Sequence, residues 1–460
     1  MGCDDTPIPQ IINHMQSNNN TELDYKEALD FLFSQLPMFS RIGAAAYKPG
    51  LDTSLELDRF FNHPHRRFKS IHVGGTNGKG STSHMLAAIL QSKGYKTALY
   101  TSPHLVDFRE RMRVNGEMIP EEKVIEFVRK WKDSGYAGHP SFFELTMMMA
   151  FNWFAEENVD YAVIEVGMGG RLDSTNIITP EVCVITNISN DHTQFLGDTP
   201  EKIAAEKAGI IKPGIPVVIG ETTDETYQVF LDKAKGVGAP IIFAEERPRI
   251  LSICPADSAE VPGGGWQGSS AEGEWISPLA GDYQLKNLNT VLNAVDAMRE
   301  AGIDIDNRSV VKGIEGVEKL TGLAGRWTVL SHSPLTIADT GHNIAGITYN
   351  MGQLDRLRGT GSERRTLRIV IGFVADKAID KILKLLPKDA EYYITNAAIP
   401  RALPATELHK RFLDAGLDGR VFPDVKSAYE KVLDESGEND IIFIGGSTFI
   451  VADLLASLPR

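Results

Sequence analysis

Cysteine is scarce in this sequence, and no long hydrophobic run is present. The 460 residues include three cysteines, Cys3, Cys183 and Cys254, and their odd number and wide spacing favour neither a disulfide framework nor a zinc site. No apolar run approaches the ~18 residues of a membrane span, and the acidic start MGCDDTPIPQ lacks the pattern of a signal peptide. These absences predict a protein of the reducing cytoplasm without a membrane partner.

Basic residues are also fewer than acidic ones. Lys and Arg total 47 against 61 Asp and Glu, which gives a formal net charge of −14. A protein that binds the backbone of a nucleic acid normally carries the opposite sign. We therefore expect no nucleic-acid partner, while a local basic pocket for one nucleotide stays compatible with this charge. The composition, with 42% hydrophobic and 23% charged residues, excludes wholesale disorder.

Apolar strand patterns alternate with helical patterns along most of the chain. They occur at 68–73, 96–101, 161–166, 181–186, 216–220 and 240–244, and again at 327–330, 335–339, 367–373, 391–395 and 440–446. This alternation predicts an α/β fold with a mainly parallel sheet covered on both faces. The Gly- and Ser-rich stretch 245–280 interrupts it and reads as a loop or hairpin excursion. A second series begins at Arg326, so we place a domain boundary between 324 and 325.

The clearest functional motif is a glycine-rich loop between a strand pattern and a helix pattern. Residues 74–82 read GGTNGKGST. Glycines let backbone N–H groups turn toward a phosphate, the start of the helix adds positive potential, and Lys79 can reach the outer phosphates. The sequence therefore predicts a phosphate-binding loop for ATP. Its members are Gly75, Thr76, Asn77, Gly78, Lys79, Gly80 and Ser81.

This loop departs from the usual string because Gly80 separates Lys79 from the hydroxyl residue. The form HVGGTNGKGST resembles the Mur ligase superfamily, and most closely its folate branch, the dihydrofolate synthase/folylpolyglutamate synthase family. Matching blocks follow in family order from about residue 47 to 451. The resemblance implies a P-loop-containing parallel-sheet N-terminal ATPase domain at 1–324. A smaller Rossmann-like α/β C-terminal domain is expected at 325–460.

Metal ligands are expected where the strand patterns end. Glu165 closes the strand pattern at 161–166, where ligands gather in open α/β sheets and a hard cation would find a carboxylate; the alternative is a salt-bridged strand end. The resemblance implies that Ser102 and His192 are further Mg²⁺ ligands, although a serine before proline also caps turns. It also implies a carbamylated Lys207 that helps to hold a second Mg²⁺ ion. By chemistry alone, Lys207 is a solvated helix lysine or a phosphate contact.

The resemblance further implies contacts to a pterin-bearing substrate and to the nucleotide. The substrate contacts would be Ser141, Phe142, Phe143 and Glu144 with Arg171, Leu172 and Asp173. By periodicity alone, the two phenylalanines are equally well core residues of a helix. The nucleotide contacts would be Asn287 near the adenine or ribose, and Arg326, Asp339 and His342 from the second domain. Asp339 and Asn287 are alternatively polar residues at helix starts. At Tyr283 the family has histidine, so no role follows for this residue.

The reaction that the resemblance implies is ATP-dependent ligation of L-glutamate to dihydropteroate, to folates already bearing glutamate, or to both. It would pass through an acyl phosphate and yield ADP and phosphate, with ATP and Mg²⁺ as cofactors and the protein as a monomer. One alternative is a peptidoglycan Mur ligase, but only 73 residues precede Gly74, which is short for the nucleotide-sugar domain of those enzymes. The other is a non-catalytic nucleotide-binding regulator. A GTPase of that kind would show Asn-Lys-x-Asp, which is absent.

Overall fold

An eight-stranded sheet forms the centre of the first lobe of this computed structural model, which describes residues 23–36, 50–191, 193–256, 261, 264–375 and 379–458. Its strands are β1 (Lys69–Gly74), β2 (Thr97–Tyr100), β3 (Met112–Val114), β4 (Glu117–Met118), β5 (Tyr161–Glu165), β6 (Val182–Ile185), β7 (Val217–Ile219) and β8 (Ile241–Phe243). The order is β4-β3-β2-β5-β1-β6-β7-β8, and all neighbouring pairs are parallel except those that β3 makes with β2 and β4. The predicted parallel sheet is confirmed, with an antiparallel edge that the sequence did not predict.

Helices cover both faces of this sheet because neighbouring strand residues point to opposite sides. Leu99 and Val163 join one apolar cluster, whereas Ala98 and Ala162 join another. The helices of the first lobe are α1 (Tyr25–Gln35), α3 (Asp52–Phe60), α4 (Lys79–Lys93), α5 (Glu121–Asp133), α6 (Phe142–Glu156), α7 (Thr193–Leu196), α8 (Pro200–Lys207), α9 (Asp224–Val237), α10 (Tyr283–Glu300), α11 (Asn307–Glu315) and α12 (Val317–Thr321). Short 3₁₀ turns are η2 (Pro64–Arg67), η3 (Phe108–Arg111), η4 (Ser174–Ile177), η5 (Ala208–Ile210) and η6 (Ala244–Glu246).

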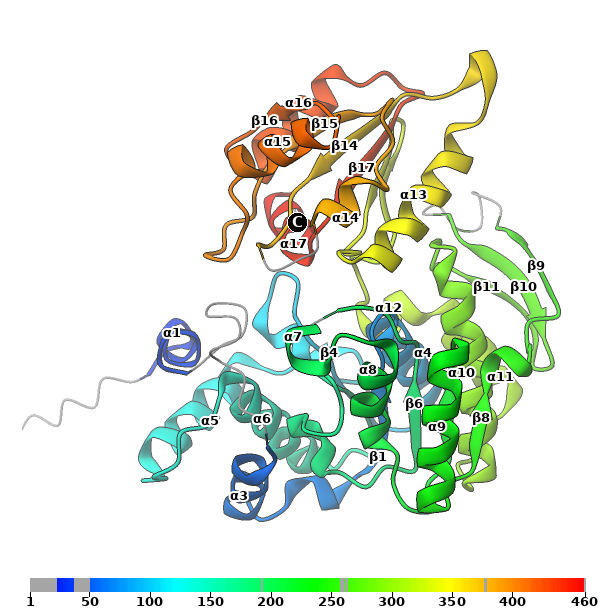
Figure 1. The fold of residues 1–460 in the computed structure, drawn as a ribbon. Coiled ribbons are helices and arrows are strands. Elements are labelled where there is room, and N and C mark those ends of the chain that lie inside the picture. Colours follow the sequence, from blue (N-terminus) through cyan, green and yellow to red (C-terminus); the bar gives the residue numbers. More distant parts are fainter. Residues whose placement is uncertain are drawn as a thin grey trace, which may run out of the picture.

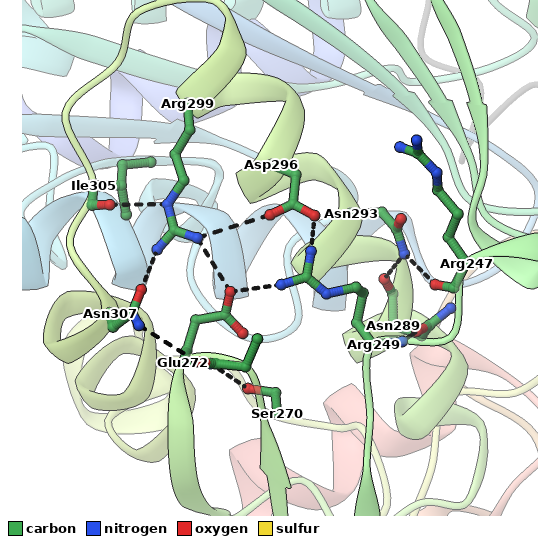
Figure 2. Close-up of polar contacts among 11 residues, drawn as sticks. Arg247, Arg249, Ser270, Glu272, Asn289, Asn293, Asp296, Arg299, Ile305 and Asn307 are labelled. Carbon is green, nitrogen blue, oxygen red and sulfur yellow. Dashed lines mark hydrogen bonds and ion pairs between the residues drawn. The ribbon is translucent and has the colours of Figure 1, made fainter.

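The excursion at 245–280 is a small antiparallel sheet and not an open loop. Its strands are β9 (Ser252–Pro255), β10 (Trp266–Ser270) and β11 (Gly273–Ser277), in the order β11-β10-β9. Figure 2 shows how a polar network fastens it to α10: Glu272 accepts hydrogen bonds from Arg249 at 2.9 Å and from Arg299 at 3.1 Å, and Asp296 pairs with both arginines. Trp275 adds an apolar contact with the core of the first lobe.

A six-stranded sheet forms the second lobe, which stands above the first lobe in Figure 1, in yellow to red. Its strands are β12 (Thr328–His332), β13 (Leu335–Ala338), β14 (Leu367–Ile371), β15 (Glu391–Ile394), β16 (Arg420–Val421) and β17 (Ile441–Gly445), in the order β12-β13-β17-β14-β15-β16. Its helices are α13 (Ile344–Arg358), α14 (Ile379–Leu383), α15 (Ala405–Asp414), α16 (Val425–Glu435) and α17 (Thr448–Ser457), with the turn η7 (Gly361–Glu363). The predicted second α/β unit is confirmed.

The elements at the start of the chain follow local sequence signals. Asp24 caps α1 through a reciprocal pair of hydrogen bonds with Glu27, as its position before the helix predicts. The polar composition of residues 1–20, which end in the run SNNN, predicts a tail; these residues, with Cys3 among them, lie outside the described residues. Within the described residues, no helix is both long and apolar enough to span a bilayer.

Candidate active site

The phosphate loop leaves the middle of the first sheet, where β1 ends, and leads directly into α4. Glycine is required at two of its positions. Gly75 has φ +134°, and a Cβ there would lie 1.9 Å from the hydroxyl oxygen of Thr186; Gly78 has φ +81°, and its Cβ would lie 2.2 Å from the side-chain oxygen of Asn287. The loop backbone therefore packs closely against the end of β6 and against α10. The N–H groups at the start of α4 provide a site suited to anionic phosphates.

The segment that follows β6 holds this loop in place. Asn187 accepts a hydrogen bond from the Thr76 N–H at 2.9 Å through its backbone oxygen, and one from the Asn77 N–H at 3.0 Å through its side-chain oxygen. The Lys79 ammonium donates to the backbone oxygen of Thr76 at 3.1 Å, across the loop. Ser81 is buried and accepts a hydrogen bond from Gln284 of α10 at 3.1 Å. The sequence assigned no role to Asn187, although its place directly after a central strand was a usable signal.

Glu165 and Ser102 lie together at the carboxyl ends of β5 and β2. The buried Glu165 carboxylate accepts the Ser102 N–H at 3.1 Å through Oε2. Burial raises the pKa of Glu165, and the charges of Lys79 and Arg326 partly oppose that effect. A Cβ on Gly80 would lie 3.9 Å from Glu165 Oε2 and 3.5 Å from the Arg326 guanidinium, so the start of α4 faces both groups.

The residues present fit a hard cation in part. Glu165 offers an oxygen with no hydrogen bond to the described residues, and Ser102, whose backbone N–H contacts the other carboxylate oxygen, carries a hydroxyl. His192 lies outside the described residues. Among the residues that are described, no group of three His, Cys, Asp or Glu side chains is arranged to hold a metal ion.

Lys207 ends α8 and is buried beneath the phosphate loop, where its ammonium donates to the Gly75 backbone oxygen at 2.7 Å. Burial and the nearby charge of Lys79 lower the pKa of Lys207 to about 7, although Asp191 and Asp173 favour the charged form. A large fraction of this amine is therefore neutral near pH 7. The prediction that it is merely a solvated helix lysine is wrong.

The second lobe contributes Arg326 and Asp339 at the junction of the two lobes. Arg326 hydrogen-bonds the Thr340 hydroxyl and faces Gly80. Asp339 directly follows β13, is almost fully buried, and accepts hydrogen bonds from four donors. These are the N–H groups of Trp327 and Gly341 and the side chains of Asn350 and Tyr283. Asp339 is thus not the cap of α13, a role that Asn343 fills by accepting the Gly346 N–H at 3.0 Å.

Three pairs of described residues make polar contacts between the lobes around the phosphate loop. Asn343 and Asn77 exchange two side-chain hydrogen bonds, at 2.8 and 3.3 Å. His342 Nε2 lies 3.4 Å from a carboxylate oxygen of Asp191. The Tyr283 hydroxyl, at the start of α10, donates to Asp339 at 2.6 Å. Burial and Asp339 raise the pKa of Tyr283 well above its usual value, so it remains a donor. The sequence assigned no role to Tyr283 or Asn343, whereas Asn77 was predicted as a member of the phosphate loop.

The predicted substrate string starts α6. Ser141 and Glu144 form the reciprocal cap of this helix, and the Ser54 hydroxyl also approaches Glu144, at 3.4 Å. Phe142 is buried in the apolar cluster of α6, as the core alternative predicted. Phe143 is only partly buried, and its ring packs so closely on Gly167 that a Cβ at that position would collide with the ring. Phe143 is therefore the aromatic ring of this string that borders the glycine turn after β5.

The acidic residue of the turn after β5, Asp173, is buried. The buried Asp173 caps η4 by accepting the Thr175 N–H at 3.0 Å, and it also accepts the Met168 N–H at 2.9 Å. Burial raises the pKa of Asp173. Arg171 is exposed and pairs with Glu206 at 2.7 Å. Leu172 lies between Arg171 and Asp173 and is half-buried.

Comparison with known proteins follows the same division into lobes. The Mur ligase middle domain matches residues 73–295, and the Mur ligase glutamate ligase domain matches residues 325–448. The dihydrofolate synthase/folylpolyglutamate synthase of Bacillus subtilis is 31% identical over 424 residues, which cover 88% of this chain and 94% of the relative. The Escherichia coli protein of the same name is 31% identical, covering 83% of this chain and 85% of the relative.

Solved structures give the same result. Mycobacterium tuberculosis folylpolyglutamate synthase complexed with ADP and AMPPCP has a TM-score of 0.82 at 28% identity, covering 95% of this chain and 99% of that chain. E. coli FolC in complex with DHPP and ADP has a TM-score of 0.78 at 28% identity, with 94% and 97% covered. A Yersinia pestis bifunctional synthase complexed with AMPPNP and Mn ion has a TM-score of 0.77 at 27% identity, with 94% and 98% covered. The chain belongs to the dihydrofolate synthase/folylpolyglutamate synthase family, the folate branch of the ATP-dependent, amide-forming Mur ligases.

Proposed function

We propose that this chain joins the amine of L-glutamate to the carboxylate of dihydropteroate and to that of reduced folates already bearing glutamate. The γ-phosphate of ATP first converts the carboxylate into an acyl phosphate, ADP leaves, and the amine then displaces phosphate to form the amide. The observation that carries the proposal is that the candidate groups lie together at the carboxyl ends of the central strands. The phosphate loop, Glu165 with Ser102, and Lys207 lie together there, opposite Arg326 of the second lobe.

The chain's own groups account for the charge that phosphoryl transfer must balance. Lys79 and Arg326 flank the start of α4 and would neutralise the triphosphate, which is most of what protein groups contribute to this reaction. Glu165, Ser102 and His192 would hold Mg²⁺, which when bound supplies charge neutralisation between phosphate oxygens. The contacts between the lobes would keep water from the acyl phosphate, which hydrolysis would otherwise destroy.

We propose Lys207 as the carbamylated lysine of the site. A carbamate forms when a neutral amine attacks CO₂ and gives up one N–H proton to solvent, and a pKa of about 7 makes the neutral amine available. The carbamate is an anion and would help to hold a second metal ion, as a cationic lysine would not. Incubation with ¹³C-bicarbonate followed by ¹³C NMR tests this directly. A carbamate resonance that is absent from Lys207→Arg is the expected result.

The remaining assignments are part of the same proposal. Phe143 with Arg171, Leu172 and Asp173 would contact the pterin, whereas Ser141, Phe142 and Glu144 would support them by building the start of α6. Asn287, Asp339 and His342 would serve the nucleotide. The two sheets support a division into domains 1–324 and 325–460. We further propose that the protein is cytoplasmic and monomeric. Light scattering on the purified protein tests the monomeric state.

The decisive experiment measures phosphate release with ATP, Mg²⁺ and L-glutamate. One reaction contains dihydropteroate and the other contains tetrahydrofolate. Release with both, dependent on glutamate, supports a bifunctional enzyme, and release with one fixes the specificity. If phosphate is released with neither folate substrate but is released with a UDP-linked muropeptide, the result would support a peptidoglycan Mur ligase. ATP binding without release in any reaction would support a nucleotide-binding regulator.

A further inference from the structure

A buried arginine near the proposed active site has no hydrogen-bonded acidic partner among the described residues. Arg111 is the last residue of η3, and its backbone oxygen accepts the Thr101 N–H at 3.0 Å. This places it beside the carboxyl end of β2, one residue from Ser102. Its side chain is 5% exposed. The sequence places Arg111 in the string RER but assigns it no role.

The contacts of Arg111 orient its guanidinium without neutralising it. Nε donates to His104 Nδ1 at 2.8 Å, and the group lies over the Phe142 ring, with the guanidinium carbon 5.3 Å from the ring centroid. Neither contact provides negative charge. Nη1 and Nη2 make no hydrogen bond or ion pair with the described residues, and neither nitrogen is sealed from solvent. Two planar donors thus point into accessible space.

The acids nearest to Arg111 are already engaged. Glu110 accepts the backbone N–H groups of Leu105, Val106 and Asp107. Glu165 acts on Arg111 only through space and accepts the Ser102 N–H. An arginine stays charged in proteins, and leaving that charge buried without a partner is costly.

A second buried arginine shows what this chain does elsewhere. Arg358 is 4% exposed, and its Nη1 and Nη2 donate to the two carboxylate oxygens of Asp389 at 3.0 and 2.9 Å. The guanidinium fork matches a carboxylate in this two-bond geometry. Arg111 presents the same fork with the carboxylate position empty of any described side chain. The comparison indicates a ligand carboxylate as the missing partner.

The surroundings indicate which carboxylate fits. Glu165, which faces the start of α4 and so the phosphates, is close enough to Arg111 to act on its charge. The Phe142 ring lies against the Arg111 guanidinium, and the ring of the next residue, Phe143, lies 5.9 Å from Tyr100. A ligand spanning this place has an aromatic body at one end and an anion at the phosphate end. The carboxylate must also approach an anionic triphosphate, and this approach needs a cation.

We propose that Arg111 binds the reacting carboxylate of the pterin-bearing acceptor and presents it to the γ-phosphate of ATP. The inference rests on the proposed function and adds to it a specificity-determining residue. Arg111 selects a carboxylate over a neutral group at the end of the acceptor, whereas the aromatic side chains select the ring. L-Glutamate, the other carboxylate source in the reaction, does not need this position.

Equilibrium binding of dihydropteroate and of its carboxamide, measured without ATP, separates these roles. Wild type should prefer the carboxylate. Arg111→Gln should bind dihydropteroate roughly 10- to 100-fold more weakly, the effect of losing a charge-assisted two-bond contact, and should bind the carboxamide as wild type does. Arg111→Lys should be intermediate, because it keeps the charge without the fork. The matched control is Arg113→Gln, two residues further along in β3, whose guanidinium donates to the Gly116 backbone oxygen; it should change neither affinity more than about 2-fold.

Steady-state kinetics supply the remaining outcomes. The KM for the acceptor should rise in Arg111→Lys, while the KM values for ATP and glutamate stay near wild type. An Arg111→Gln that keeps the full preference for the carboxylate, or that raises only the KM for glutamate, overturns the inference although the proposed function stands. A wild type that binds dihydropteroate no better than the carboxamide overturns it as well. A wild type without glutamate-dependent phosphate release overturns the proposed function itself.

Discussion

The asparagine pair between the lobes makes the coupling of ATP binding to lobe closure testable. Asn343 donates to Asn77 and accepts from it, while its oxygen also caps α13. Asn343→Ser separates these two roles, because serine caps a helix about as well as asparagine but is too short to reach Asn77. Each neutral hydrogen bond contributes about 0.5–1.5 kcal/mol. Losing two should therefore cost about 1–3 kcal/mol of the closed arrangement.

That loss corresponds to roughly a 5- to 150-fold decrease in the population of the closed arrangement relative to the open one. We expect kcat/KM for ATP to fall within that range, measured by phosphate release at saturating acceptor and glutamate. In an Asn77→Ala background, Asn343→Ser should have little further effect, because the pair is already broken. The matched control is Asp424→Ser, which changes the cap of α16 in the same lobe without a contact to the first lobe. Equal kcat/KM values for Asn343→Ser, the control and wild type would refute the coupling.

Three further predictions concern single residues. Lys79→Ala and His192→Ala should each abolish glutamate-dependent phosphate release with the circular-dichroism spectrum unchanged; near-wild-type turnover by either would contradict its assignment. Burial lowers the pKa of Lys207 to about 7 from 10.5, so between these values the unfolded state binds more protons. The free energy of unfolding should then rise with pH by up to about 1.4 kcal/mol per pH unit in CO₂-free buffer. Denaturant titrations at several pH values measure this slope, which Lys207→Met should lack. Tyr283→Phe should lower the free energy of unfolding by about 1–3 kcal/mol, because it removes a donor to the buried Asp339 carboxylate; an equal loss in Tyr283→His, which keeps a donor, would argue against the hydrogen bond.

Local patterns in the sequence predicted most of the fold because the deciding interactions are close in the chain. The strand pattern at 68–73 and the helix that ends at Gly94 are both present, with Gly94 in the left-handed conformation that closes α4. The helical pattern at 307–320 predicts one helix, but the structure divides it at Gly316 into α11 and α12. The short strands β3 and β4 have too few residues for a readable alternation, so only pairing with β2 reveals them.

The excursion at 245–280 shows the opposite case. Its Gly- and Ser-rich sequence has the composition of a loop, yet it forms three paired strands. Contacts between distant residues decide this structure. Glu272 lies between Arg249 and Arg299, and Trp275 packs into the core of the first lobe (Figure 2). Neither contact has a signature within a short window of sequence.

The site divides in the same way. Motifs predicted that residues gather where the parallel strands end, because the carboxyl ends of such strands lie on the same side of the sheet. Glu165 and Ser102 do meet there. They could not predict how much of each side chain is already in use. Ser141 and Glu144 carry a motif match, but their polar groups form a helix cap. Arg111 carried no assignment, but its Nη1 and Nη2 make no hydrogen bond to the described residues. Free hydrogen-bonding capacity is a property of the folded chain alone.

Asp339 shows what that capacity implies for the nucleotide. A carboxylate has about four lone-pair positions, and four donors occupy them, of which the Trp327 and Gly341 N–H groups are fixed by the backbone. A nucleotide hydroxyl that bonds directly to Asp339 must therefore displace either Asn350 or Tyr283. Tyr283 is the only one of the four that comes from the first lobe. Displacing Tyr283 would exchange a contact between the lobes for a contact with ATP, so that nucleotide binding at Asp339 would itself change how firmly the lobes are joined.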